Sequence, residues 1–110
     1  MANDSAAIGN LFQAIAAKSN DEQVDILLEK AGMRLERIVS HGHASAPDFW
    51  YDQSEHEWVT VLSGWGELTF DDGEVVRLTP GEHINIPAHK RHRVSATSAT
   101  EATVWLALFY

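Results

Sequence analysis

The chain of 110 residues contains no cysteine. This absence excludes disulfide bonds, zinc sites built from thiolates, and catalytic cysteines. Any metal that the protein binds must therefore be held by nitrogen and oxygen atoms. Long apolar runs are also absent: none approaches the roughly 20 residues that a membrane-spanning helix needs, and the N-terminus has no basic segment followed by an apolar stretch. We therefore expect a cytoplasmic protein that does not associate with membranes.

Basic residues are scarce as well. Eight lysines and arginines stand against 16 aspartates and glutamates, which gives a formal net charge of -8 at pH 7. Binding to nucleic-acid phosphates requires a basic face, and the one basic cluster, residues 90–93, is too short to form it. We therefore expect the ligand to be a small molecule and not a nucleic acid.

The N-terminal third of the chain carries a helical pattern at its start. Its apolar side chains recur at helical spacing, and Asp4 or Ser5 would cap the helix that they form. These apolar residues are Ile8, Leu11, Phe12 and Ile15. The pattern predicts a short helix over residues 6–17, packed on the outside of the domain.

The next segment supports two interpretations. Ser19 and Glu22 have the spacing of a capping box for a second helix that would end at residue 28. Residues 30–33, however, resemble a turn between two apolar runs, 24–28 and 35–39. We favour a hairpin here, and the helix remains the alternative.

From residue 34 onward the pattern is that of short strands separated by turn residues. The strands are expected at residues 35–39, 58–62, 67–70, 74–78, 83–86, 92–95 and 103–110. Asp72-Gly73, which lies between two of these runs, is typical of a β-hairpin. Together the length and the pattern predict one all-β domain over residues 1–110, with an extension at 1–33 and a sandwich or barrel at 34–110.

Two stretches, residues 49–59 and 80–94, concentrate the polar and aromatic side chains that can carry chemistry. A glutamate in the first stretch is followed by a glycine after six residues, and the second contains glycine, proline and histidine at intervals of five and four residues. The matching residues are Glu57 and Gly64 for the first spacing, and Gly81, Pro87 and His92 for the second. These spacings resemble the two sequence motifs of the cupin family, over roughly residues 34–110.

The resemblance implies a double-stranded β-helix barrel of the jelly-roll type, a metal held inside it by three or four side chains, and a tendency to dimerise. The chain departs from the family where a His-x-His pair is usual. Depending on the gap before Glu57, those positions hold Tyr51 and Gln53, or Trp50 and Asp52. From the metal site that the family implies, only Glu57 and His92 carry over.

Strand alternation places Glu55, Gln53 and Tyr51 on the same side as Glu57. We therefore expect Gln53, Glu57 and His92 to hold a divalent ion, with Tyr51 and Trp50 as walls of the pocket. Oxygen and nitrogen ligands of this kind suit Mn²⁺, Fe²⁺, Ni²⁺ or Zn²⁺.

Two further residues are weaker candidates for metal ligands. Asp52 would be a ligand only if a bulge shifted the register. His89 stands where the second motif usually has glycine, and it is the other candidate. The remaining histidines near these stretches, His41, His43 and His56, are expected to face solvent.

Two classes of function follow from this site. The first is a metal-dependent enzyme, of the dioxygenase or isomerase kind, acting on a small molecule with Glu55 or His89 as general base. The second is a non-catalytic module that binds a small ligand or a metal. The C-terminal run of residues 104–110 is apolar on both faces, a pattern that needs cover on both sides, and we expect a homodimer to supply part of it.

Overall fold

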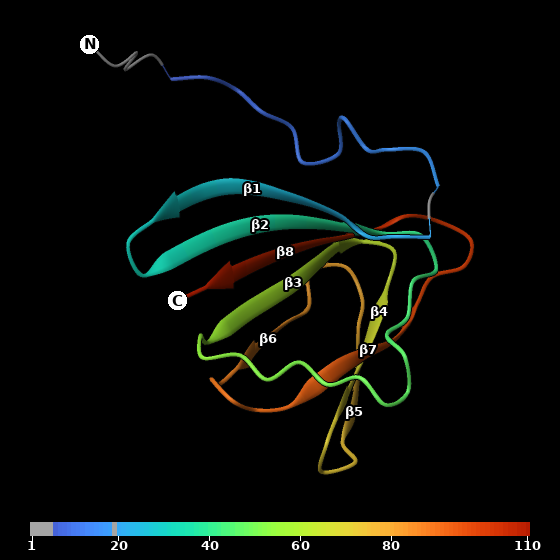
Figure 1. The fold of residues 1–110 in the computed structure, drawn as a ribbon. Coiled ribbons are helices and arrows are strands. Elements are labelled where there is room, and N and C mark those ends of the chain that lie inside the picture. Colours follow the sequence, from blue (N-terminus) through green and yellow to red (C-terminus); the bar gives the residue numbers. More distant parts are fainter. Residues whose placement is uncertain (1–5, 19) are drawn as a thin grey trace.

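The computed structural model describes residues 6–18 and 20–110, which form eight strands in two antiparallel sheets (Figure 1). The strands are β1 (Gln23–Lys30), β2 (Met33–Ser40), β3 (Glu57–Ser63), β4 (Gly66–Phe70), β5 (Val75–Leu78), β6 (His83–Ile86), β7 (His92–Thr97) and β8 (Thr103–Phe109). One sheet has the order β1-β2-β8-β3-β6, and the other has the order β5-β4-β7. The predicted all-β fold is confirmed, and no helix in the described part of the chain could cross a membrane.

Turn residues identified in the sequence connect the strands. The Asp72-Gly73 turn connects β4 to β5, with Thr69 paired to Val75 across it. Gly73 adopts a φ of 92°, which glycine tolerates without strain, and the Asp72 carboxylate accepts a hydrogen bond from the amide of Glu74 at 2.9 Å. The predicted hairpin is confirmed.

The alternative of a second helix before residue 30 is wrong. Residues 23–30 are strand β1, which forms a hairpin with β2, as favoured above. Ser19 of the supposed capping box lies outside the described residues. The pairing is interrupted once, by a bulge between Ile26 and Leu28, and β1 forms one edge of its sheet.

The predicted helix over residues 6–17 is also wrong. The Arg37 guanidinium, on the outer side of β2, donates hydrogen bonds to the carbonyls of Leu11, Gln13 and Ala14. Those carbonyls are the acceptors that a helix would use internally. Ala14 has a φ of 54°, outside the helical region. The proposed caps, Asp4 and Ser5, lie outside the described residues.

The poor packing of the apolar side chains also explains why residues 6–17 form no helix. Ile8 is fully exposed, Phe12 is 55% exposed, and Leu11 and Ile15 are only half-buried, so no member of the apolar stripe is packed in the core. Most helices of this length depend on such packing. The segment therefore follows the outside of the sheet as an irregular chain held by polar contacts.

The core lies between the two sheets. Its aromatic members come from the facing strands β4 and β8, and the cluster comprises Val59, Val61, Leu68, Phe70, Leu78, Ile86, Trp105, Ala107 and Phe109. Strand β8 lies in the middle of the five-stranded sheet, between β2 and β3. Its inner side chains are therefore covered by the opposite sheet of the same chain.

Candidate functional site

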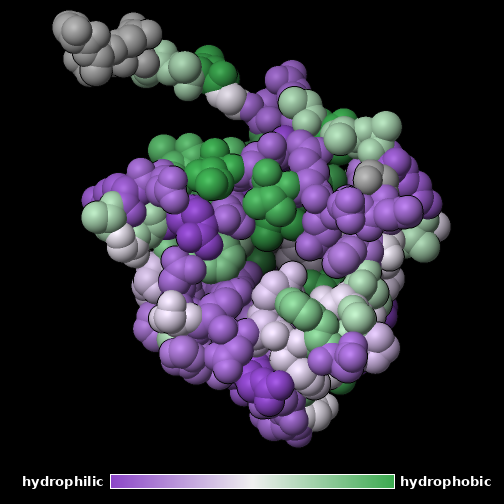
Figure 2. All heavy atoms as spheres, in the orientation of Figure 1, coloured by the Kyte–Doolittle hydropathy of each residue, from purple (hydrophilic) through white to green (hydrophobic). Residues whose placement is uncertain are grey.

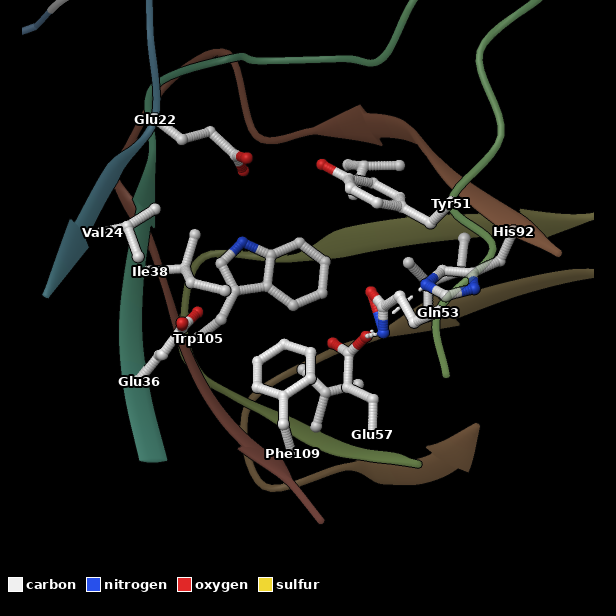
Figure 3. Close-up of a pocket in the computed structure, with 13 residues that line it drawn as sticks. Glu22, Val24, Glu36, Ile38, Tyr51, Gln53, Glu57, His92, Trp105 and Phe109 are labelled. Carbon is white, nitrogen blue, oxygen red and sulfur yellow. Dashed lines mark hydrogen bonds and ion pairs between the residues drawn. The ribbon is translucent and has the colours of Figure 1, made fainter. Parts of the chain in front are cut away.

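A cavity of about 250 Å³ opens between the sheets (Figure 3). Its walls are largely apolar. Three aromatic residues (Tyr51, Trp105 and Phe109) and three carboxylates (Glu22, Glu36 and Glu57) line it, together with Gln53, His92 and aliphatic side chains. A concave, mainly apolar pocket with a few polar groups is the usual form of a small-molecule site.

Glu57 and His92 meet at one end of this cavity, although 35 positions separate them in the sequence. Glu57 is the first residue of β3 and His92 the first of β7. The Nε2 atom of His92 lies 3.5 Å from Oε1 of Glu57. The Gln53 amide donates to the same oxygen at 3.3 Å. The structure thus brings together the three residues that the sequence selects as metal ligands.

The surroundings of His92 control its protonation. Its Nδ1 lies 2.9 Å from the carbonyl of Lys90, which fixes the ring. Burial alone lowers the pKa of His92, but the hydrogen bonds to Glu57 and Lys90 and the charge of Glu57 outweigh it. The pKa of His92 therefore lies above its ordinary value of 6.5. In the protonated ring both N–H groups have acceptors, so the pair can store a proton inside the barrel.

Tyr51 covers the other side of the imidazole. Its ring stacks on that of His92 with the centroids 5.4 Å apart, and its backbone pairs with that of His92. Burial, and then the charges of Glu22 and Glu57, raise the pKa of Tyr51. The phenol therefore stays protonated, as a hydrogen-bond donor inside the cavity.

Trp105 forms the floor of the cavity opposite this pair. Its position requires Gly66 on the facing sheet, because a Cβ there would clash with the indole ring. The indole N–H donates to Oγ of Ser40 at 3.0 Å, and the Ser40 hydroxyl donates to Oε2 of Glu22 at 2.7 Å. This chain of hydrogen bonds fixes the ring and holds the Glu22 carboxylate at the cavity.

Other candidate residues lie outside the cavity. Asp52 and His89 pair with each other at 2.8 Å on the surface. Glu55 pairs with Arg34 at 3.3 Å, because a bend at residues 54–55 interrupts the alternation that would have turned it inward. Trp50 is half-buried and packs near Arg91 and Arg93. The structure does not bring these four residues to Glu57 and His92.

Sequence reasoning did not select Glu22 and Glu36 as site residues. Glu36 alternates with Ile38 on β2, and both line the cavity, so the period of two was a usable signal. Glu22 immediately precedes β1, and its sequence context indicates only a capping box. His56 is exposed, as expected, whereas His43 is half-buried and 3.8 Å from Glu22.

Residues 36–109 match the model of the cupin domain family. The chain belongs to the cupin family. No curated protein matches it at a significant level. Among solved structures, a Ralstonia eutropha protein described as a "putative mannose-6-phosphate isomerase" is 42% identical, with 94% of this chain and 97% of that chain covered and a TM-score of 0.90.

More distant cupin-like structures support the fold alone. A Klebsiella pneumoniae protein with a double-stranded β-helix domain is 16% identical, covers 96% of this chain and 90% of its own, and has a TM-score of 0.76. The conserved protein SPY1581 of Streptococcus pyogenes is 22% identical, with 97% and 89% covered and a TM-score of 0.75. The double-stranded β-helix expected from the sequence is thereby confirmed.

Cupins usually hold a metal, so the donors must be compared with what an ion requires. Catalytic metal sites generally use three protein ligands. Here Glu57 and His92 are strong donors, but Gln53 is a weak one and Tyr51 is a protonated phenol. In residues 6–18 and 20–110, no three His, Cys, Asp or Glu side chains converge. Beside Glu57 and His92, the described residues provide no third strong donor. In this respect the site does not fit the metal centre that the family implies.

Proposed function

We propose that this cupin binds a small organic molecule in the barrel cavity and uses the Glu57–His92 pair to orient it and to exchange a proton with it. The observation that carries the proposal is the burial of this pair, with side chains 11% and 5% exposed, in a largely apolar cavity. Polar groups in such a setting fix the orientation of a ligand, because leaving them unpaired is costly.

The chemistry available to this pair is proton transfer. Protonated His92 carries a hydrogen at Nε2 that a ligand oxygen or nitrogen can accept in place of Glu57. The Glu57 carboxylate can accept a proton in return, and Gln53 remains to hydrogen-bond its Oε1. An acid and a base on one side of a bound molecule are the requirement for general acid–base catalysis, including isomerisation.

Ligand-induced thermal stabilisation tests the proposal. A panel of small alcohols, amines, carboxylic acids and sugars would be screened against the wild-type protein and against Glu57→Gln and His92→Gln. His56→Gln is the control, because His56 is exposed and outside the cavity. We expect compounds that stabilise the wild type and the control to lose most of their effect on the other two variants. Equal stabilisation of all four proteins would contradict the proposal.

A second candidate is the metal-dependent enzyme that the family resemblance implies. It is favoured by one distance: the 3.5 Å between Nε2 of His92 and Oε1 of Glu57 allows both to bond one ion at about 2.0–2.2 Å. Gln53 would have to serve as the third metal ligand, with the weak amide donor noted above. If this candidate is right, protein reconstituted with Mn²⁺, Fe²⁺, Ni²⁺ or Zn²⁺ retains metal, His92→Ala loses it, and His56→Ala keeps it.

The homodimer and the cytoplasmic location remain predictions. A free surface for a second copy exists on β1, where Val24, Ile26 and Leu28 are each more than half exposed. Figure 2 shows hydrophobic side chains gathered over this strand, beside a hollow in the same face. Sedimentation of the wild type against Ile26→Lys would test for a dimer on this surface: the variant is expected to be monomeric.

A further inference from the structure

We propose that the ligand of this cavity is an organic cation, with its ammonium group held between the Glu22 carboxylate, the Tyr51 hydroxyl and the indole face of Trp105. This inference rests on the proposed function, that the cavity binds a small molecule, and it names the class of that molecule. It follows from the charges, the hydrogen bonds and the aromatic surfaces of the cavity.

The charged side chains that line the cavity are mainly acidic. Three carboxylates line it, and no lysine or arginine is among the described residues that do so. Two of the carboxylates already have a partner: Glu36 pairs with Arg34 at 2.6 Å, and Glu57 with His92. The nearest basic group to Glu22 is His43, at 3.8 Å. Glu22 therefore presents a negative charge that no fixed cation of the described chain neutralises.

Glu22 is also held in place. The Ser40 hydroxyl, which itself accepts the indole N–H of Trp105, donates to one of its oxygens. The side chain is only 17% exposed. In Figure 3 its carboxylate and the Tyr51 hydroxyl point toward one another across the cavity, above the Trp105 ring. A carboxylate fixed and partly desolvated in this way interacts more strongly with a cation than a mobile surface carboxylate does.

The aromatic residues complete the cation site. Indole offers the strongest cation–π surface among side chains, and Trp105 presents its ring to the cavity between Glu22 and Glu57. The Tyr51 hydroxyl makes no hydrogen bond to another described residue, and it points toward the Glu22 carboxylate across the cavity. Burial, and then the charges of Glu22 and Glu57, raise the pKa of Tyr51, so the hydroxyl keeps its proton. The Glu22 carboxylate, the Tyr51 hydroxyl and the Trp105 ring thus line the same cavity.

The same charges oppose anionic ligands. A sugar phosphate, the kind of substrate in the description of the Ralstonia protein, would bring a dianion beside the Glu22 carboxylate, whose charge no described lysine or arginine neutralises. Like charges at such distances in a partly buried site are strongly unfavourable. We therefore expect mannose 6-phosphate not to bind this chain.

Three compounds with one apolar body and different charges test the inference, namely benzylamine, benzyl alcohol and benzoate, and mannose 6-phosphate is measured beside them. Their affinities would be measured by calorimetry at pH 7 for the wild type and Glu22→Gln. The control is Glu74→Gln, which removes an equal charge from an exposed turn. We expect the wild type to bind benzylamine about tenfold more tightly than benzyl alcohol, and benzoate most weakly. Glu22→Gln should lose that preference while its affinity for benzyl alcohol is unchanged.

The outcomes separate this inference from the function on which it rests. If benzylamine and benzyl alcohol bind equally well, if benzoate or mannose 6-phosphate binds best, or if Glu74→Gln loses the preference as Glu22→Gln does, the cation assignment is wrong and the cavity remains a ligand site. If none of the compounds binds the wild type, the proposed function fails, and the inference fails with it.

Discussion

Two carboxylate–histidine pairs join the same two segments of this chain, one inside the barrel and one outside. Asp52 and His89 lie 2.8 Å apart with side chains 50% and 68% exposed. Glu57 and His92 are farther apart, at 3.5 Å, but their side chains are 11% and 5% exposed. The shorter distance belongs to the pair whose contacts water can replace, so burial, and not separation, distinguishes the pair for which we propose a functional role.

The two pairs have a common structural origin. The segment around Tyr51 bonds through its backbone to the start of β7, and the amide of His89 donates to the carbonyl of Gln53. Neighbouring side chains on these connected segments then point to opposite sides. Gln53 and His92 face the cavity, whereas Asp52 and His89 face solvent.

The largest difference between the pairs should appear on removing a carboxylate. We expect Glu57→Ala to lower the free energy of unfolding by about 3 kcal/mol, because it leaves a buried imidazole and the Gln53 amide without their acceptor. Asp52→Ala should lower it by at most about 0.5 kcal/mol, since the pair is exposed. Urea denaturation at pH 6 measures both. Similar losses in the two variants would show that burial does not separate the pairs.

A smaller effect should follow from pH. Because the pKa of His92 is raised in the folded protein, protonation stabilises the fold; this contribution is complete below about pH 6.5 and is lost as the pH rises through the folded-state pKa. With metal removed by a chelator, the stability difference between the wild type and His92→Gln should therefore shrink between about pH 6 and pH 8. His89→Gln serves as the surface comparison, and a constant difference for His92→Gln would contradict the assignment.

The smallest effect concerns His89 itself. This residue has a φ of 64°, in the left-handed region that glycine adopts without strain. We expect His89→Gly to leave stability unchanged or raise it by up to about 1 kcal/mol, despite the lost contact with Asp52. His89→Ala, which loses the contact and keeps the strain, should be less stable than His89→Gly in the same thermal melts.

The strands could be predicted because their signals are local. Asp72-Gly73 and the runs on either side of it determine a hairpin without reference to the rest of the chain. The helix over residues 6–17 failed for the opposite reason. Arg37 binds the carbonyls of Leu11 and Gln13, which lie 26 and 24 positions before it, and helical periodicity contains no information about such a partner.

The candidate site likewise contains residues that sequence signals predict and residues that only the three-dimensional arrangement brings in. The family motif selects Glu57 and His92, and alternation adds Gln53. Glu22 reaches the cavity only because β1 and β2 join the same sheet as β8 and β3, a non-local arrangement that the sequence pattern does not specify. Glu55 was placed inward by an alternation that the bend at residues 54–55 interrupts.

The bulge between Ile26 and Leu28 has a consequence for the behaviour of the protein at high concentration. An edge strand with exposed aliphatic side chains is a template on which strands of other molecules can add without limit. An extra residue in the middle of that strand breaks the regular ladder and increases its local twist. The bulge therefore opposes fibre growth at this open edge, while the aliphatic side chains of β1 stay exposed.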